Sequence, residues 1–443
     1  MPFGPIAALR RTKLRNPILI AAVAGLVAIA VPASSQARDA RPDPGFGAGA
    51  GWVTTSIPGL DALAYDATVL RNGKIAVAGQ ASGPTGDGQI VVARYRRDGR
   101  LDSSFGTNGI FKSALPADDG PFIATSVVQE RTTRKLVVGG GYGQGSMLAL
   151  RLTAGGRLDK TFGKGTGVVS VPVGGIGESL AIQDDNRILL GGSNANVEGR
   201  PMVVARLKRG GRLDRSFGAA GVAQSLFWND HQASSAGVLG IAPTDDGGLV
   251  ASGHIDYIGT DGHGTAGVFR LDADGDPVQG FGTGGSVEVA FPSGSGPPAF
   301  WFPCAMTMDA HGRITVTGDG TTEAGAGLLT TRLTAAGAPD PSFGRSGDGG
   351  LVTTGPSDGN ATTCGAALTA NGSLTVGVQS QLAQLTDRGA RRARFGPGGV
   401  LAITQPAGVE INSVNRSDSH RVVVAGSAGN DIYVARYLVP PRR

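Results

Sequence analysis

The chain of 443 residues is poor in aromatic side chains, which are 5% of it, and only 17% of its residues are charged. Four of the 40 basic residues and none of the 35 acidic ones lie in the first 37 positions, so the remainder has a net charge of +1. That balance favours neither a nucleic acid nor an anionic membrane as partner. No segment after residue 37 has the hydrophobic period of an amphipathic helix, which argues against a helical fold.

Glycine, in contrast, is abundant, with 74 residues against a usual share of about 7%. The glycines show no period of three, which excludes a collagen-like chain. Because 40% of the residues are apolar, the chain can still build a core. Many tight turns between many short strands are the simplest use for so much glycine.

The N-terminus has the pattern of an export signal. Basic residues at positions 10–15 precede an apolar run of 16 residues, Pro17–Pro32, and Ser35–Ala37 fits a small-x-small cleavage site. The run is shorter than the ~20 residues of a membrane span. Residues 1–37 are therefore predicted to be a signal peptide, with a permanent anchor as the alternative. We expect a protein that is secreted or held at the cell envelope, with no transmembrane span after cleavage.

One pattern recurs through the rest of the chain. A strand ends in Arg, or in Gln in one copy, and a polar turn and a Leu-Asp-x-Ser-Phe-Gly-like element follow. In six copies the Phe lies 11 residues after the Arg or Gln, and successive Phe residues are 52 to 64 positions apart. This combination is typical of one supersecondary unit with loop insertions. The Phe residues are Phe105, Phe162, Phe217, Phe281, Phe343 and Phe395, and Phe46 belongs to a similar element near the N-terminus.

The two ends of the chain hold complementary parts of a seventh repeat. Residues 42–47 form a Phe-Gly element without a preceding Arg strand, and Ala435–Tyr437 ends an Arg strand without a following element. A closed ring explains this division, because the N-terminal strand then covers the edge of the last blade. The predicted fold is all-β: a seven-bladed β-propeller with four antiparallel strands per blade, formed by residues 38–443. Trp52–Ile57 is predicted as the outer strand of the last blade.

The Leu-Asp-x-Ser-Phe-Gly-x-x-Gly element with its upstream Ala-Arg-Tyr/Leu strand resembles the delta-60 repeat family of bacterial exported proteins. The resemblance covers the whole chain after residue 37 and is most specific in the first three copies. It implies a β-propeller and no defined activity.

The Arg and Asp columns of the repeat are predicted to form structural salt bridges. In blade six both are absent, with Gln384 and Arg392 in their places, and joint loss is expected because an unpaired, partly buried charge is costly. Blade four keeps Arg270 but has Val278 in the Asp column. The predicted pairs are Arg94 with Asp102, Arg151 with Asp159, Arg206 with Asp214, and Arg332 with Asp340.

The two cysteines, Cys304 and Cys364, each lie eight residues before the glycine of the turn that connects the first and second strands of a repeat, here called the first turn. They are therefore expected to begin the innermost strands of neighbouring blades. Export permits oxidation, so a disulfide is predicted between them, with two buried free thiols as the alternative.

A candidate ligand site lies in the loops around blade four. His254–Gly264 is the longest loop within a blade, and Ser225–Ser235 and Phe291–Phe302 are the most aromatic connections between blades. Aromatic rings beside carboxylates and imidazoles suit a sugar or peptide, and imidazole with carboxylate could ligate a divalent ion. Ordinary solvated loop insertions are the alternative. The candidate residues are His231, His254, His263, Asp256, Asp261, Tyr257, Trp228 and Trp301.

These features predict an exported, non-catalytic propeller that binds a protein or a glycan. We expect a monomer with no nucleic-acid partner and no cofactor. The alternative is a propeller enzyme, a lyase or hydrolase acting on polysaccharide or ester substrates, that uses the blade-four histidines and carboxylates, with a divalent metal as the cofactor it could need. A purely structural surface module is a third hypothesis, because propellers serve many unrelated functions.

Overall fold

The structure is a computed structural model that describes most of the chain from Asp39 to Val439. The predicted signal peptide lies outside the described residues. The described ranges are 39–84, 88–113, 122–142, 145–173, 175, 177–194, 196–197, 201–225, 227, 233–257, 264–289, 300–322, 325–344, 352–354, 364–369 and 372–439.

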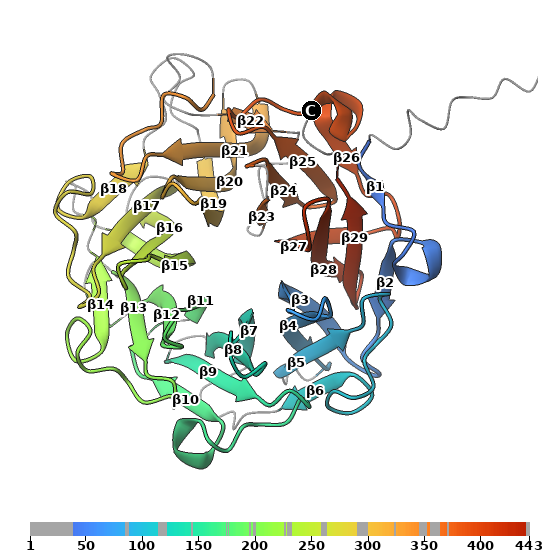
Figure 1. Cartoon of the computed structure of the whole chain (residues 1–443), viewed down its shortest axis with the longest axis horizontal. Coiled ribbons are helices and arrows are strands. Elements are labelled where there is room, and N and C mark those ends of the chain that lie inside the picture. Colours follow the sequence, from blue (N-terminus) through green and yellow to red (C-terminus); the bar gives the residue numbers. More distant parts are fainter. Residues whose placement is uncertain are drawn as a thin grey trace, which may run out of the picture. The chain divides into compact units, whose positions relative to one another are not determined.

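Seven antiparallel sheets stand around a central axis (Figure 1), which confirms the predicted seven-bladed propeller. Blade one holds β3 (Asp61–Val69), β4 (Ile75–Ser82), β5 (Gly88–Tyr95) and β6 (Ile110–Ser113). Blade two holds β7 (Phe122–Gln129), β8 (Leu136–Tyr142), β9 (Met147–Leu152) and β10 (Val168–Val171). Blade three holds β11 (Gly177–Ile182), β12 (Ile188–Ser193), β13 (Met202–Leu207) and β14 (Val222–Ser225). Blade four holds β15 (Ala233–Pro243), β16 (Leu249–Tyr257), β17 (Gly264–Leu271) and β18 (Ser286–Val289).

The remaining blades follow the same order from the axis outward. Blade five holds β19 (Phe300–Met308), β20 (Ile314–Thr322), β21 (Gly325–Leu333) and β22 (Val352–Thr354). Blade six holds β23 (Cys364–Leu368), β24 (Leu374–Val378), β25 (Gln381–Leu385) and β26 (Val400–Ala402). Blade seven holds β27 (Val409–Arg416), β28 (Arg421–Ala428) and β29 (Asp431–Leu438). Short 3-10 turns occur in the Phe-Gly elements at η2 (Gly47–Gly49), η3 (Gly163–Gly165), η4 (Ala393–Phe395) and η5 (Pro397–Gly399). Among the described residues, no helix has the length and apolarity needed to cross a bilayer.

The N-terminal segment closes the ring, as predicted. Both β1 (Arg41–Pro42) and β2 (Trp52–Thr55) pair antiparallel with β29, so they share the outer edge of blade seven. Asp43 and the Phe46 element lie between these two short strands.

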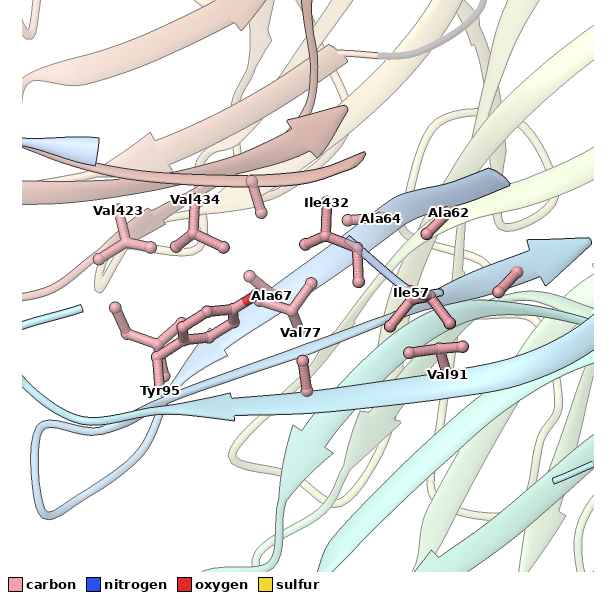
Figure 2. Close-up of a cluster of buried hydrophobic side chains, with 14 of the residues drawn as sticks. Ile57, Ala62, Ala64, Ala67, Val77, Val91, Tyr95, Val423, Ile432 and Val434 are labelled. Carbon is pink, nitrogen blue, oxygen red and sulfur yellow. The ribbon is translucent and has the colours of Figure 1, made fainter. Parts of the chain in front are cut away.

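The core lies between neighbouring blades, because the middle strands of each blade are buried on both faces. In blade one, Val77 and Val91 belong to the same buried cluster as Val434 of blade seven (Figure 2). The next residues along the strands, Ala78 and Val92, belong to the core shared with blade two. The two-residue period of a strand thus directs alternate side chains to opposite neighbours.

Each complete repeat ties its blade to the next one through an Arg, an Asp and a Phe, which we call the Arg–Asp–Phe module. In blade one, Arg94 Nε donates to Asp102 Oδ2 at 2.7 Å, and its guanidinium carbon lies 4.5 Å from the centre of the Phe105 ring. Arg94 Nη1 donates to the carbonyl oxygen of Ala154 in blade two at 2.5 Å. The Phe105 ring packs beneath Gly156 of blade two, where any Cβ would collide with it. One module therefore satisfies a buried charge and seals the boundary between two blades.

All four predicted Arg–Asp pairs form, and a fifth closes the ring. Burial raises the pKa of Asp102, but hydrogen bonds from Lys74 and Ser104 and the charge of Arg94 outweigh it and hold that pKa well below its ordinary value. The other Arg Nε to Asp Oδ2 distances are 2.6 Å for Arg151–Asp159, 2.9 Å for Arg206–Asp214, 2.7 Å for Arg332–Asp340 and 2.7 Å for Arg436–Asp43.

Blades four and six lack the Arg–Asp pair of the module, and other contacts replace it. In blade four, Arg270 turns to Asp246 in the first turn, at 2.8 Å. In blade six, Gln384 is buried without a charge and donates to Thr375 Oγ1 at 3.2 Å. The joint loss of Arg and Asp in blade six thus leaves no buried arginine at that position.

Candidate binding site in the central channel

The innermost strands share a backbone irregularity that shapes the channel along the ring axis. In six of the seven, one residue is skipped in the pairing with the second strand, which is a β-bulge. The skipped residue that these strands share lies five positions before the residue that opens the turn between the first and second strands. Strand β15 has a further shift, between Ala233 and Ser235. Cys364 occupies this position in β23, whose described residues pair without a shift. The seven equivalent residues are Tyr65, Thr125, Glu178, Leu239, Cys304, Cys364 and Asn412.

All seven of these residues, which we call the channel ring, line one cavity of about 350 Å³. The half formed by blades seven to three is polar, with Asn412, Tyr65, Thr125 and Glu178 from the channel ring. The half formed by blades four to six is apolar, with Leu239 and the two cysteines. A cavity of this size with opposite polar and apolar walls is suited to a small amphiphilic group.

Asp66, next to Tyr65 on the polar side, is a structural carboxylate. It accepts hydrogen bonds from the backbone N–H of Val127 in blade two at 2.9 Å and from Ser413 Oγ in blade seven at 2.8 Å. Burial raises the pKa of Asp66, and these hydrogen bonds oppose the rise. Asp66 thus joins three blades at the channel wall.

Glu178 is the channel carboxylate whose charge is least compensated. Its side chain packs against Gly237 of blade four, where a Cβ would collide with the carboxylate. The buried Oε2 atom has no hydrogen-bond partner among the described residues. Burial, together with the charge of Asp256, raises the pKa of Glu178 to about 7. Glu178 can therefore gain or lose a proton near neutral pH.

His254 lies beside Asp256, inside strand β16 rather than in a loop. Its Nε2 is 4.0 Å from Asp256 Oδ2, and its ring stacks on Phe302 of blade five with centroids 5.1 Å apart. His254 is 8% exposed, and burial lowers its pKa against the opposing charge of Asp256. The predicted loop was wrong here, because β16 continues to Tyr257.

The prediction for Trp301 as a ligand-facing residue was also wrong. β19 begins at Phe300, so Trp301 belongs to a strand and not to the connection before it. The side chain is 0% exposed and packs in the core between blades four and five. The other candidates, Trp228, His231, Asp261, His263 and the side chain of Tyr257, lie outside the described part of the molecule.

The predicted disulfide forms between Cys304 and Cys364, with a Cα–Cα distance of 5.4 Å. It joins the inner strands of blades five and six within the channel ring. Cys304 was expected to begin its strand, but it lies at the bulge in the middle of β19. In the described part of the chain, no group of three His, Cys, Asp or Glu side chains is arranged to hold a metal ion.

Comparison with known proteins supports the propeller fold. A family described as a domain of unknown function (DUF5122) beta-propeller matches residues 70–105. The match contains the first Arg–Asp–Phe module. No curated protein matches the chain in sequence.

Several solved structures are similar to this chain at low identity. A catalytically inactive virginiamycin B lyase from Staphylococcus aureus with quinupristin is 11% identical, covers 88% of this chain and 99% of its own, and has a TM-score of 0.47. The polysaccharide lyase Uly1 is 10% identical, with coverages of 87% and 91% and a TM-score of 0.43. An α-L-arabinofuranosidase from Fusarium graminearum, in complex with an iminosugar inhibitor, is 11% identical, with coverages of 91% and 96% and a TM-score of 0.38.

Proposed function

We propose that this chain is an exported, non-catalytic propeller that acts as a binding scaffold at the cell envelope or outside the cell, with its ligand in the central channel. One observation carries the proposal: a single backbone position, repeated in every blade, holds six different residue types around one cavity. A position kept for packing alone would be expected to repeat its residue type, as the Phe of the module does. The channel ring therefore has the variation of a surface that recognises one particular ligand.

The chemistry of the wall limits that ligand. Glu178 puts a carboxylate on one side of the cavity, and Leu239 and Met306 present an apolar surface on the other. A glycan or peptide end with an amine beside an apolar face complements both walls. Binding of an ammonium group would also stabilise the deprotonated form of Glu178.

The test compares glucosamine tetramers with N-acetylglucosamine tetramers, by calorimetry at pH 7.5, on the chain without its first 37 residues. We expect the amine-bearing oligomer to bind more tightly. Glu178→Gln should weaken that binding about tenfold, because a charge-assisted hydrogen bond is lost. The matched control is Glu410→Gln, which removes an exposed carboxylate from inner strand β27. Equal affinities of wild type and the Glu178 variant for both oligomers would remove the channel as the site.

An enzymatic function is favoured by one observation, the pKa of about 7 for Glu178 beside a second carboxylate. A carboxyl group that titrates near the working pH can serve as a general acid or base. Turnover of polysaccharide or ester substrates that disappears in Glu178→Gln would establish a propeller lyase or hydrolase. The same result would overturn the non-catalytic scaffold.

A further inference from the structure

The end of the ring that holds the first turns and the Phe-Gly elements, here called the turn face, carries opposite charge in different blades. Six residues after the Arg of the module, blades one to three carry exposed arginines. Because the backbone is the same in the other blades, the fold itself does not require an arginine there. The residues at this position are Arg100, Arg157, Arg212, Asp276, Ala338 and Ala390 in blades one to six.

Blade four reverses the sign of this face. Asp245, Asp246, Asp274 and Asp276 are exposed there, and the described turn-face segments 244–248 and 272–285 contain no Lys or Arg. In blades two and three, further exposed cations accompany the arginines, among them Lys160. We call the exposed Lys and Arg residues on the turn face of blades one to three the basic arc. The basic arc thus lies beside the acidic turn face of blade four, and blade six carries a separate group of exposed arginines that includes Arg388 and Arg391.

A groove lies within the basic arc, between blades two and three. It has a volume of about 460 Å³ and is lined by Lys164, Arg212 and Arg215, with Val169 and Leu213 as apolar lining. The three cations have no acidic partner among the described residues, unlike the buried arginines of the modules. They are free to pair with a ligand, and arginine pairs with a carboxylate through two parallel hydrogen bonds.

We propose that this groove binds an acidic polysaccharide whose sugar residues carry carboxylates, with the polymer continuing over the basic arc. The apolar lining suits the face of a sugar ring, and the surrounding cations suit its carboxylates. Proteins that bind single-stranded nucleic acids present exposed aromatic rings on which the bases stack. The repeated rings on this part of the turn face, Phe105, Phe162 and Phe217, are at most 1% exposed. The acidic turn face of blade four marks one end of the track. This site is separate from the central channel and does not depend on the function proposed for it.

The experiment measures binding of polygalacturonate to the chain without its first 37 residues, with neutral dextran and a 20-base-pair DNA duplex as comparisons. We expect polygalacturonate to bind, with an affinity that falls as salt is raised, and dextran not to bind. Arg212→Gln with Arg215→Gln should weaken binding about tenfold or more, because two charge-assisted contacts are lost. Both side chains are exposed, so the thermal unfolding temperature of the variant should stay unchanged.

The matched control is Arg388→Gln with Arg391→Gln, which removes the same charge from the turn face of blade six. We expect it to keep polygalacturonate binding within about twofold of wild type. Equal losses in the two variants would mean attraction by overall charge and would overturn the groove. Binding of the DNA duplex in preference to polygalacturonate, or no binding of polygalacturonate at low salt, would overturn the polysaccharide. Glu178→Gln should leave this affinity unchanged, which separates the outcome from that of the channel.

Discussion

The Arg–Asp–Phe modules and the channel ring are both repeated around the propeller, yet they treat side-chain identity in opposite ways. The module keeps its Arg–Asp pair in five blades. The bulge of the channel ring is present in six blades, and a different type of residue occupies it in each. The module buries an ion pair, and removing either partner destabilises the protein because the other charge is left buried and uncompensated. The channel ring borders a cavity, so its side chains are not bound by that condition. The comparison teaches that repetition of a residue reports packing, and that repetition of backbone alone leaves room for recognition.

We expect the largest effect on stability when the arginine of a module is removed. Arg206 is 1% exposed and pairs with Asp214 at 2.9 Å. We expect Arg206→Leu to lower the free energy of unfolding by about 3–5 kcal/mol, because the buried Asp214 then keeps only the longer contacts to Arg187 at 3.5 Å and Lys208 at 3.7 Å. Denaturant unfolding measures this change. The double variant with Asp214→Asn should lose less than the sum of the two single losses, and additive losses would contradict the pairing.

The disulfide is the part of the channel ring where we expect a large effect on stability. Replacing both Cys304 and Cys364 with Ser should lower the free energy of unfolding by about 2–4 kcal/mol, because the bridge closes a loop across 60 residues in the unfolded chain. Unfolding with and without reductant measures the effect in the wild type. Free thiols detected by mass spectrometry of the non-reduced protein would contradict the bridge.

Glu178 should make stability depend on pH in a defined direction. Its pKa rises from 4.5 to about 7 on folding, so the native state binds the proton more tightly than the unfolded chain. The contribution is fully present below pH 4.5 and is lost as the pH rises through about 7. After allowance for partial exposure, we expect a change on the order of 2 kcal/mol. Glu178→Gln should flatten the profile in this window; an unchanged slope would assign it to another group.

The smallest effect is expected where the channel ring meets only the cavity. Leu239→Asn should change the free energy of unfolding by less than about 1 kcal/mol. The neighbouring Val238 is 0% exposed in the core, and Val238→Asn should cost about 3 kcal/mol or more, because an unpaired amide is buried. A large loss at Leu239 would place it with the packing residues and blur the distinction between the two regions.

The modules could be predicted from the sequence because their contacts are local and repeated. Arg206 and Asp214 are eight residues apart, and the same spacing recurs in other blades. The closure of blade seven could be predicted for the same reason, since its two parts complete a known unit. The cysteines were found because they share a register with each other.

The channel ring and the true place of Trp301 were beyond such reasoning. A bulge is defined by the register between two strands, and no side-chain type marks it in this chain. Trp301 stands in an aromatic, proline-containing stretch, and only its pairing with β20 shows that the strand begins earlier. Glu178 carries no motif, and its pKa depends on Gly237 and Asp256 from another blade. Contacts between blades that vary from one boundary to the next leave no period in the sequence.

The closure of blade seven has a consequence for the order of folding. Arg436 and Asp43 make the same contact as Arg206 and Asp214, but 393 residues separate them along the chain instead of eight. In an otherwise unfolded chain, joining the distant pair costs about 3 kcal/mol more in loop entropy. Six modules or their substitutes can therefore form as each blade is completed, while the last pair must wait for both termini. The boundary that contains Asp43 is where we expect the ring to close last and to open first.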